Sequence, residues 1–354
     1  MTITLIPKRH RSSFSVDLLR EVATQARLAE GAEGVRRILR TVFMSEQIPI
    51  RNVAQEVGLP VPVVAAVRGE LEKRGILTRK GGVSLTGKGL SFVQSELGLS
   101  CRKRFARPGV PPIPVVLKEV CKRLANIAER RPKVDVKLDQ SHATPETVLR
   151  RAMYLYEHDA LEGRNLLVLG DDDLTSVAVG LLAQHLEIVL GQVVVLECDG
   201  RLVDFLSVIG EREGLPITVI ARDLREDMPA DLCGQMDVFF TDPPYTLPGL
   251  SLFVSRGASA LVPEVGKQGF VSFGRRSPDE TARAIGLLIE MGFAPVEIIP
   301  DFNEYVGAQV LGGVSQMIRL ISTGKPQPLV TGKYHGALYT ADLKRRRQGD
   351  RASH

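Results

Sequence analysis

The sequence predicts a two-domain α/β protein, in which a mainly parallel sheet covered by helices follows a smaller helical domain. From Asn165 onward, short apolar segments alternate with segments of helical periodicity, which is typical of repeated βα units. Before this region, the proline- and glycine-rich residues 108–114 interrupt regular structure and indicate a domain boundary. A length of 354 residues, 44% hydrophobic and 25% charged, suits about two globular domains.

Composition excludes several classes of protein. No apolar stretch approaches the ~18 residues needed to cross a bilayer, and the first residues carry no apolar signal core. The four cysteines are too widely spaced to indicate a disulfide framework or a zinc site. We therefore expect a cytoplasmic protein with reduced thiols. The net charge of +5 is too modest to indicate nucleic-acid binding by itself.

The first hundred residues carry a helix-turn-helix pattern followed by a hairpin. The two strands of this hairpin are joined by Lys80-Gly81-Gly82, a strong hairpin signal. This order of elements resembles the winged-helix family. The predicted elements are a helix over 32–44, a short helix ending at Gly58, a helix over 62–74, and strands over 76–78 and 83–85.

The second helix of this pattern would read DNA in a DNA-binding member of that family. It offers Arg68, Lys73 and Arg74, but Glu70 and Glu72 interrupt its basic face. Because phosphate contacts supply most of the affinity for DNA, a reading helix usually presents a cleaner basic surface. We favour a structural or oligomerising role for this domain, with DNA binding as the alternative.

The second domain begins with helices and continues as alternating strands and helices. Thr144 and Pro145 are typical of a helix N-terminus, and that helix should run to about His158. The last two strands suggest an antiparallel edge, as in Rossmann-like methyltransferase sheets. Strands are predicted over 166–169, 193–197, 217–221, 238–240, 269–273, 296–300 and 315–321, and helices over 115–130, 174–190, 202–213 and 279–291, with a polar loop at 133–140. The expected segments are 1–107 (winged-helix-like), 108–340 (Rossmann-like) and 341–354 (a flexible basic tail).

Three carboxylates follow the first strand of this sheet. Gly170 occupies the place of a glycine-rich nucleotide loop, but Asp171, Asp172 and Asp173 come next. An anion there would meet a charge of about −3, and one like-charge pair at 4 Å costs on the order of 4 kcal/mol at a dielectric of 20. One of these acids is expected to cap the helix beginning near Leu174. A metal ion is the alternative occupant, but we favour an organic polycation.

Acidic residues also follow the second and third strands. Glu197 ends the second strand, where an acid commonly accepts hydrogen bonds from a ribose diol, and Asp199 lies two residues further on. Asp223 follows the third strand, where methyltransferase-like folds often place an acid against the adenine amino group. Because ligands of such sheets bind at the carboxyl ends of the strands, these acids together predict an adenosine site.

The motif Asp242-Pro243-Pro244-Tyr245 follows the fourth strand. It resembles the signature of methyltransferases that alkylate exocyclic amino nitrogens. Paired prolines fix the backbone, so that a carboxylate and a carbonyl can accept hydrogen bonds from the attacking nitrogen, and Tyr245 supplies a wall or a cation–π face. The motif predicts transfer of an alkyl group from a sulfonium to a nitrogen, although a proline turn that only ends the strand is the alternative.

The Gly-Asp-Asp-Asp loop and the Asp-Pro-Pro-Tyr-Thr motif together resemble those of the branched-chain polyamine synthases of thermophiles. That family is formed by N4-bis(aminopropyl)spermidine synthases, which are aminopropyltransferases. The resemblance covers nearly the whole chain. It implies decarboxylated S-adenosylmethionine as co-substrate, with no separate cofactor, and spermidine as acceptor. The implied products are N4-aminopropylspermidine, N4-bis(aminopropyl)spermidine and methylthioadenosine, and the implied state is a cytoplasmic homo-oligomer that binds neither membrane nor DNA.

The resemblance and the motifs assign roles to individual residues. By analogy with linear aminopropyltransferases, Asp173 faces the aminopropyl end of the donor. One of the three acids after the first strand (Asp171, Asp172 or Asp173) or Asp242 is expected to accept the proton of the attacking amine. Because the same acids stabilise the protonated amine, we expect the activity to have an alkaline pH optimum. Glu304 and Tyr305 are expected to hold a terminal ammonium, as is Tyr334 or His335 near the tail, which could close over the site. The catalytic candidates are Asp171, Asp172, Asp173 and Asp242; the donor-binding candidates are Gly170, Glu197, Asp199, Asp223 and Pro243; the acceptor-binding candidates are Asp172, Asp173, Tyr245, Glu304 and Tyr305; no metal ligand is assigned.

Two other functions remain open at this stage. A nucleic-acid amino-N-methyltransferase would use S-adenosylmethionine itself and hold its substrate with the winged helix. A transcription regulator would use the sheet only to sense a nucleoside or polyamine. Acids at the strand ends beside an amine-alkylation motif disfavour the pure sensor.

Overall fold

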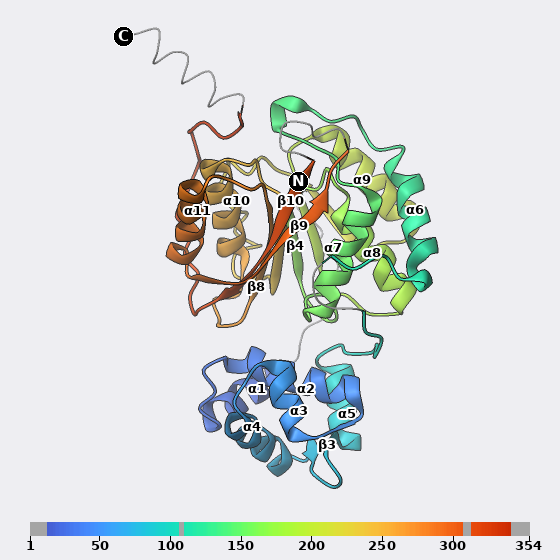
Figure 1. The fold of residues 1–354 in the computed structure, drawn as a ribbon, viewed down its shortest axis with the longest axis vertical. Coiled ribbons are helices and arrows are strands. Elements are labelled where there is room, and N and C mark those ends of the chain that lie inside the picture. Colours follow the sequence, from blue (N-terminus) through green and yellow to red (C-terminus); the bar gives the residue numbers. More distant parts are fainter. Residues whose placement is uncertain (1–12, 106–109, 307–312, 341–354) are drawn as a thin grey trace.

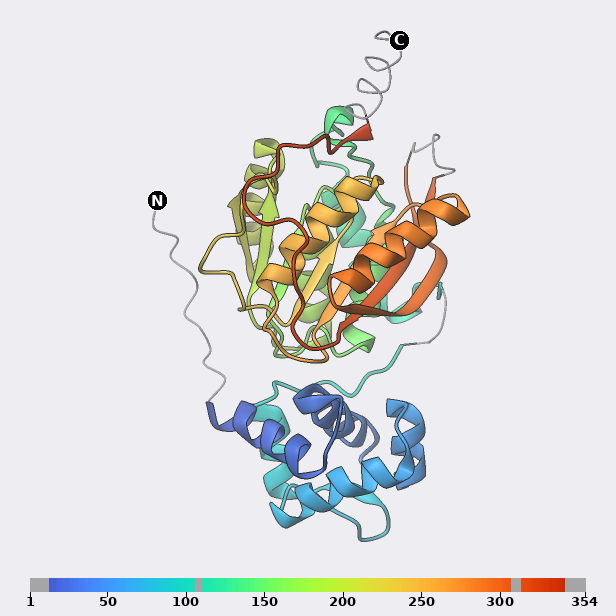
Figure 2. The same cartoon turned by 90° about the vertical axis from the view of Figure 1, so that its left-hand side faces the viewer.

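The computed structural model describes residues 13–105, 110–306 and 313–340. A helical N-terminal lobe, blue in Figure 1, lies against one end of a larger α/β lobe, and Figure 2 shows the same arrangement from the side. The expected boundary at 107/108 and the expected tail at 341–354 lie outside the described residues.

The N-terminal lobe surrounds its own apolar core, to which Val22, Ile38 and Leu71 contribute fully buried side chains. The predicted helices and hairpin are confirmed, and the short helix ends where Gly58 adopts a left-handed conformation (φ 69°). The first and last helices and the first strand were not predicted. The elements are α1 (Ser13–Gln25), α2 (Gly31–Ser45), β1 (Gln47–Ile48), α3 (Ile50–Val57), α4 (Val61–Lys73), β2 (Leu77–Thr78), β3 (Val83–Leu85) and α5 (Gly87–Ser95), with the strands in the antiparallel order β1-β3-β2.

The α/β lobe contains a sheet of seven strands in the order β6-β5-β4-β7-β8-β10-β9. The first five strands of that order are parallel, and β10 runs antiparallel to both β8 and β9. The mainly parallel sheet with an antiparallel edge is therefore confirmed. The strands are β4 (Leu166–Leu169), β5 (Val193–Glu197), β6 (Ile217–Ala221), β7 (Val238–Thr241), β8 (Gln268–Phe273), β9 (Phe293–Glu304) and β10 (Val314–Ser322).

Helices cover both faces of the sheet, because its central strands are apolar on both sides. Along β4, Leu166 and Val168 enter one core, whereas Leu167 and Leu169 enter the other. Helices α6 to α9 pack on the first face, and α10 and α11 on the second (Figure 1). The helices are α6 (Lys118–Ala128), α7 (Pro145–Glu157), α8 (Thr175–Leu186), α9 (Gly200–Glu213), α10 (Leu247–Ala260) and α11 (Pro278–Glu290), with 3-10 turns η1 (Val115–Leu117) and η2 (Val136–Leu138).

Three elements differ by several residues from the prediction. Helix α6 begins at Lys118 and ends at Ala128, within the predicted 115–130, because the 3-10 turn η1 precedes it. Helix α8 ends at Leu186 instead of continuing to residue 190, because Glu187 adopts a left-handed conformation (φ 55°) that cannot extend the helix. Strand β9 spans Phe293–Glu304 and is longer than the predicted 296–300. As the edge strand it exposes alternate side chains, so its sequence lacks the continuous apolar run of a central strand.

A buried network of charges joins the two lobes. Glu33 of α2 accepts hydrogen bonds from Arg164 (2.6 Å) and Lys267 (2.6 Å), and Arg36 donates to Asp159 (2.8 Å). Arg164 and Lys267 directly precede β4 and β8, so the N-terminal lobe contacts the amino-end edge of the parallel strands. The predicted site lies at the carboxyl ends, on the opposite edge of the sheet.

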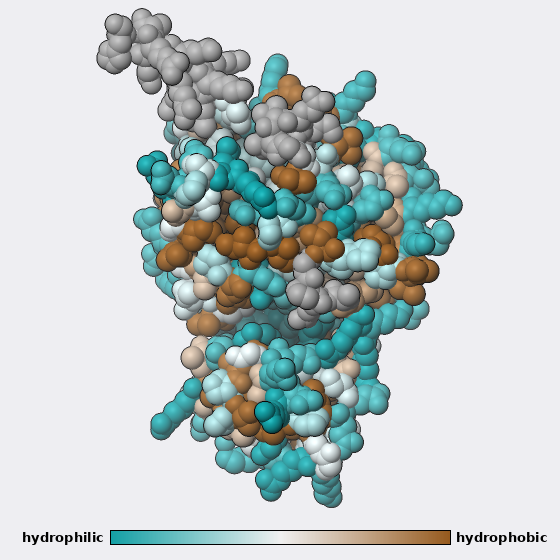
Figure 3. All heavy atoms as spheres, viewed as in Figure 1, coloured by the Kyte–Doolittle hydropathy of each residue, from teal (hydrophilic) through white to brown (hydrophobic). Residues whose placement is uncertain are grey.

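In the view of Figure 3, which is that of Figure 1, hydrophobic residues form a band across the α/β lobe. The edge strand β9 exposes Val296 (47%) and Ile298 (45%).

No helix among the described residues is long and apolar enough to span a membrane.

Candidate active site

The first acid of the triad has a structural role. Asp171 is 1% exposed and accepts hydrogen bonds from the backbone amides of Thr175 (2.6 Å) and Ser176 (3.2 Å) at the start of α8. Burial raises its pKa to about 7, although these hydrogen bonds oppose the shift. The expectation that one acid caps this helix is confirmed. Gly170, before it, adopts a left-handed conformation (φ 71°) that turns the chain out of β4.

The third acid meets the Asp-Pro-Pro-Tyr motif through one arginine. Arg151 of α7 is fully buried and donates from Nη1 to Asp173 Oδ2 (2.6 Å) and from Nη2 to Asp242 Oδ2 (2.7 Å). Residues 169 and 241 are register partners on the parallel strands β4 and β7, so the two carboxylates project from neighbouring strand ends. The structure therefore brings the two predicted motifs together around a cation that was not predicted.

Two tyrosines continue this cluster. Tyr305 donates its hydroxyl to Asp242 Oδ2 (2.6 Å) and lies 2.6 Å from the hydroxyl of Tyr245 and 2.9 Å from that of Ser315. A Cβ atom at Gly274 would lie 2.6 Å from the ring of Tyr245, so this position must lack a side chain for the ring to occupy its place. Of the predicted residues, Tyr305 therefore contacts Asp242 directly, and Tyr245 contacts it through Tyr305.

The environment of the cluster shifts several pKa values. Burial raises the pKa of Asp242 to about 7, while Arg151 opposes the shift. Burial, with Asp173 and Glu197 nearby, raises the pKa of Asp172 well above its usual range. A carboxylate with a raised pKa is a suitable proton acceptor near neutral pH. Burial also raises the pKa of Tyr245 and of Tyr305, so both phenols remain hydrogen-bond donors.

The estimate of about −3 for the charge at the acid loop is wrong, because it omitted two arginines. Arg151 pairs with the third acid, and Arg131, just after α6, donates to the backbone carbonyl of Asp172 (3.3 Å). The side chain of Asp172 is half-buried and accepts a hydrogen bond from the amide of Ser141 (3.3 Å). His142, beside Arg131, has its pKa lowered to about 4 by burial, so it is neutral at pH 7. The carboxyl groups of this acid cluster, which are Asp171, Asp172, Asp173 and Asp242, still outnumber the two guanidinium groups.

The acids after β5 are held by backbone groups. Glu197 is 4% exposed and accepts hydrogen bonds from the amides of Asp171 (2.8 Å) and Asp199 (2.9 Å). It therefore joins the ends of β4 and β5. Asp199 caps α9 by accepting from the amide of Arg201 (3.0 Å), and it also pairs with that side chain (2.5 Å). Both acids lie at the strand end where the donor's ribose was predicted.

A segment near the C-terminus lies beside the third strand end. Asp223 pairs with Arg225 (3.2 Å), and the guanidinium of Arg225 lies 5.6 Å from the ring centre of Tyr339. Tyr339 is 6% exposed, and burial raises the pKa of its phenol. Cys198 and Asp223 shift this pKa in the same direction. Tyr339 therefore lies beside the predicted adenine acid. It was not predicted, because an aromatic residue far along the chain gives no signal of this neighbour.

Three candidates are not brought into the acid cluster. Glu304, the last residue of β9, is 53% exposed and pairs with Arg150 (3.5 Å), whereas Tyr305, the next residue, contacts Asp242. Tyr334 donates its hydroxyl to the carbonyl of Ala337 (3.0 Å), and His335 is exposed. The acceptor-binding role expected for Glu304 therefore has no support in this geometry.

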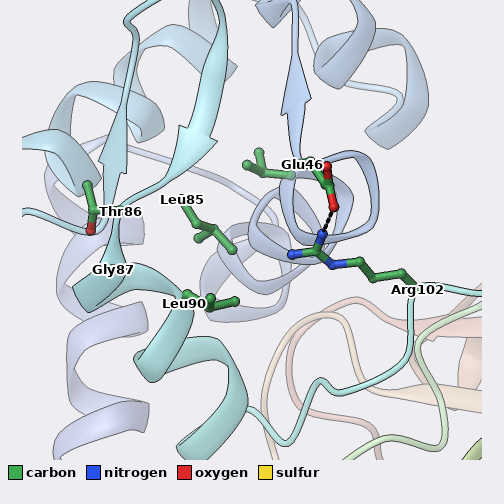
Figure 4. A pocket seen from close by; sticks show the side chains of 7 residues that line it. Glu46, Leu85, Thr86, Gly87, Leu90 and Arg102 are labelled. Carbon is green, nitrogen blue, oxygen red and sulfur yellow. Dashed lines mark hydrogen bonds and ion pairs between the residues drawn. The ribbon is translucent and has the colours of Figure 1, made fainter.

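Two cavities lie away from these residues. The smaller has a volume of about 230 Å³ and lies in the N-terminal lobe, where Arg102 pairs with Glu46 (Figure 4). The larger, of about 640 Å³, is lined by residues 100–103 and 185–187. Neither is lined by a predicted site residue. Within the described ranges, no group of three or more histidine, cysteine or acidic side chains is arranged to hold a metal ion.

Comparisons with known proteins agree with this geometry. Residues 119–346 match the family model of the branched-chain polyamine synthase A C-terminal domain. An uncharacterized Methanocaldococcus jannaschii protein is 37% identical over 91% of this chain and 83% of its own length. The N(4)-bis(aminopropyl)spermidine synthase of the same organism is 29% identical over 82% of each chain. The crystal structure of the Thermus thermophilus branched-chain polyamine synthase, in complex with N4-aminopropylspermidine and 5'-methylthioadenosine, has a TM-score of 0.59 and 27% identity, covering 92% of this chain and 98% of that one.

Proposed function

Because this chain belongs to the branched-chain polyamine synthase family, we propose that it is an aminopropyltransferase acting on spermidine. It transfers aminopropyl groups from decarboxylated S-adenosylmethionine to the central secondary amine. The products are N4-aminopropylspermidine, then N4-bis(aminopropyl)spermidine, with methylthioadenosine released at each step.

The observation that carries this proposal is the acid cluster at the ends of β4 and β7. There Asp173 and Asp242 share Arg151, Asp172 lies near enough to both for their charges to raise its pKa, and Tyr305 donates to Asp242. The chain is similar to an enzyme crystallised with N4-aminopropylspermidine and 5'-methylthioadenosine. Carboxylates and phenol oxygens accept hydrogen bonds from ammonium groups, which suits a polyamine. The same cluster disfavours a negatively charged substrate such as nucleic acid, which makes the methyltransferase alternative weaker.

The proposed step is an in-line displacement. The lone pair of the neutral central nitrogen attacks the aminopropyl carbon bound to sulfur, a nitrogen–carbon bond forms, and the carbon–sulfur bond breaks. The electron pair of the broken bond returns to sulfur and gives the neutral thioether. The proton of the new ammonium passes to a carboxylate with a raised pKa, for which Asp172 and Asp242 are the candidates.

The remaining residues bind the donor. We assign the ribose to Glu197 and Asp199, the adenine to Asp223, and the turn that admits the donor to Gly170 and Pro243. The terminal ammonium of the donor pairs with the acids after β4, where the carboxylate of intact S-adenosylmethionine would be repelled.

A thermal-shift panel tests this function. We expect decarboxylated S-adenosylmethionine and spermidine each to raise the melting temperature, because ligands stabilise the state that binds them. Duplex DNA should leave the melting temperature unchanged. Mass analysis of the product should show spermidine heavier by one or two aminopropyl groups. Stabilisation by DNA together with a methylated product would contradict the proposal.

The N-terminal lobe is proposed to be a winged-helix-like packing module that does not read DNA. The basic residues of α4 are engaged within their own helix, since Glu70 pairs with Lys73 (2.6 Å) and Arg74 (2.8 Å). We also propose that the protein is a cytoplasmic homo-oligomer, for which the exposed apolar side chains of the edge strand β9 offer a contact surface.

A further inference from the structure

Arg151 is the most deeply buried charge of the site, and each side of its guanidinium group has a partner. Nη1 and Nη2 donate to Asp173 and Asp242, and Nε donates to Asn303 Oδ1 (2.8 Å). Burying a guanidinium is costly unless its donors are satisfied. A purely structural contact between α7 and the sheet would not need such a group, because apolar side chains pack there at lower cost.

The orientation of this guanidinium is fixed by a second layer of contacts. Asn303 donates from Nδ2 to the hydroxyls of Ser315 (3.0 Å) and Ser272 (3.2 Å), so its carbonyl oxygen must face Arg151. The guanidinium also lies 5.2 Å from the ring centre of Phe240. Because the guanidinium is planar and its donors diverge at fixed angles, it sets the relative placement of the two carboxylates it holds.

We propose that Arg151 is a positioning residue for aminopropyl transfer, which holds Asp173 and Asp242 in one fixed geometry toward the attacking amine. The inference rests on the proposed function. Without Arg151, two carboxylates from neighbouring strand ends would repel each other and separate. Tyr305, which receives a hydrogen bond from Arg151 (3.1 Å) and donates to Asp242, would lose its orientation as well.

The neighbouring residue supplies a matched control. Arg150 lies on the same turn of α7 but pairs with the exposed Glu304 and donates to the carbonyl of Phe302 (3.2 Å). Arg150→Gln therefore removes an equal charge next to Arg151 without touching the acid cluster.

The test compares Arg151→Lys, Arg151→Gln and Arg150→Gln in the full chain, with decarboxylated S-adenosylmethionine and spermidine. We expect Arg151→Gln to lower kcat by about 100-fold or more, which is the usual effect of losing a fixed donor in an active site. The acid limb of its pH–rate profile should move to higher pH, because Arg151 favours the ionised form of Asp242. Arg151→Lys should restore part of kcat, and Arg150→Gln should stay within about 3-fold of the natural protein.

A stabilising role alone would reduce the melting temperature and leave the pH profile of the folded fraction unchanged, and that result would overturn the inference. Equal losses in Arg150→Gln and Arg151→Gln would also overturn it. If Arg151→Gln does not fold, Arg151→Lys carries the test, because it keeps the buried charge but not the planar group that holds both carboxylates. A kcat of Arg151→Lys within about 3-fold of the natural protein would then overturn the inference. Failure of the proposed function is distinguishable, since the unmodified chain would then give no aminopropylated product.

Discussion

Asp242 combines a proposed catalytic role with a buried environment that disfavours its charge, so replacing it should separate activity from stability. Asp242→Asn keeps the shape of the side chain but removes its charge. If this carboxylate accepts the proton or orients the amine, kcat should fall by about 10² to 10⁴-fold, the range usual for a general base. The product is measured by mass analysis after reaction with spermidine and decarboxylated S-adenosylmethionine.

The stability of the same variant follows from the pKa. In the folded protein burial raises the pKa of Asp242 from 3.8 to about 7, so the ionised form is destabilised on folding. At pH 8 this corresponds to on the order of 4 kcal/mol, an upper limit because an asparagine amide does not reproduce every contact of a protonated carboxyl. This destabilisation of the folded protein by ionised Asp242 is absent below about pH 4, grows between about pH 4 and 7, and is constant at higher pH. Asp242→Asn should therefore be more stable than the natural protein at pH 8 and gain less at pH 5.

Urea unfolding at the two pH values measures this difference. Asp301→Asn is the control, because Asp301 is 52% exposed, pairs with Arg275 at the surface, and has a left-handed conformation that asparagine tolerates. It should change neither activity nor stability. An Asp242→Asn variant that turns over at half the natural rate, or that is several kcal/mol less stable at pH 8, would refute the reasoning.

Three further predictions concern other parts of the molecule. Asp171→Ala should cost about 1–2 kcal/mol of unfolding free energy, because it removes the cap of α8. Asp172→Asn should instead lower kcat at least 100-fold without loss of stability, because burial disfavours the ionised form of Asp172. Urea unfolding and turnover assays distinguish the two variants, and the reverse result contradicts our interpretation of the loop. Glu33→Gln should lose about 3 kcal/mol at pH 7, because Arg164 and Lys267 each lose one of their buried acidic partners and keep Asp159 and Asp237. The difference should shrink as the pH falls below the unfolded pKa of 4.5. An unchanged urea midpoint would show that the lobes are held by other contacts, and the exposed Glu290→Gln serves as control. Any binding of duplex DNA, measured by fluorescence anisotropy, should be weak and should disappear as the salt concentration is raised. A tight complex with one DNA sequence at physiological salt would contradict the packing role of the N-terminal lobe.

The fold was predictable from sequence wherever a local pattern determines it. Strands β4, β5 and β6 have the predicted bounds, because each is a short apolar segment in the parallel part of the sheet. Helix α7 begins where Thr144 accepts a hydrogen bond from the amide of Thr147 (3.2 Å), as its capping residues indicate. Strand β9 was underestimated because an edge strand is stabilised by pairing with β10, which its own sequence does not reveal.

The site was predictable only for residues that directly follow the strands. The acids after β4 and the Asp242 motif lie where the strand-end rule places them. Arg151 was missed because an arginine in an amphipathic helix normally faces solvent, and its partners Asp173 and Asp242 are distant in the sequence. The orientation of Glu304 was not predictable for a related reason, since it depends on the pleat of β9.

The charge of the donor tests the central claim most directly. Decarboxylated S-adenosylmethionine ends in an ammonium group that the acids after β4 can bind, whereas intact S-adenosylmethionine adds a carboxylate at that end. Arg131 and Arg151 reduce the negative charge there, but the carboxyl groups outnumber these two cations, and a bound ammonium favours their ionised forms. Calorimetric titration should therefore show at least 100-fold tighter binding of the decarboxylated donor, and mass analysis should show an aminopropylated spermidine. Equal affinity for the two donors, or a methylated product, would contradict the account.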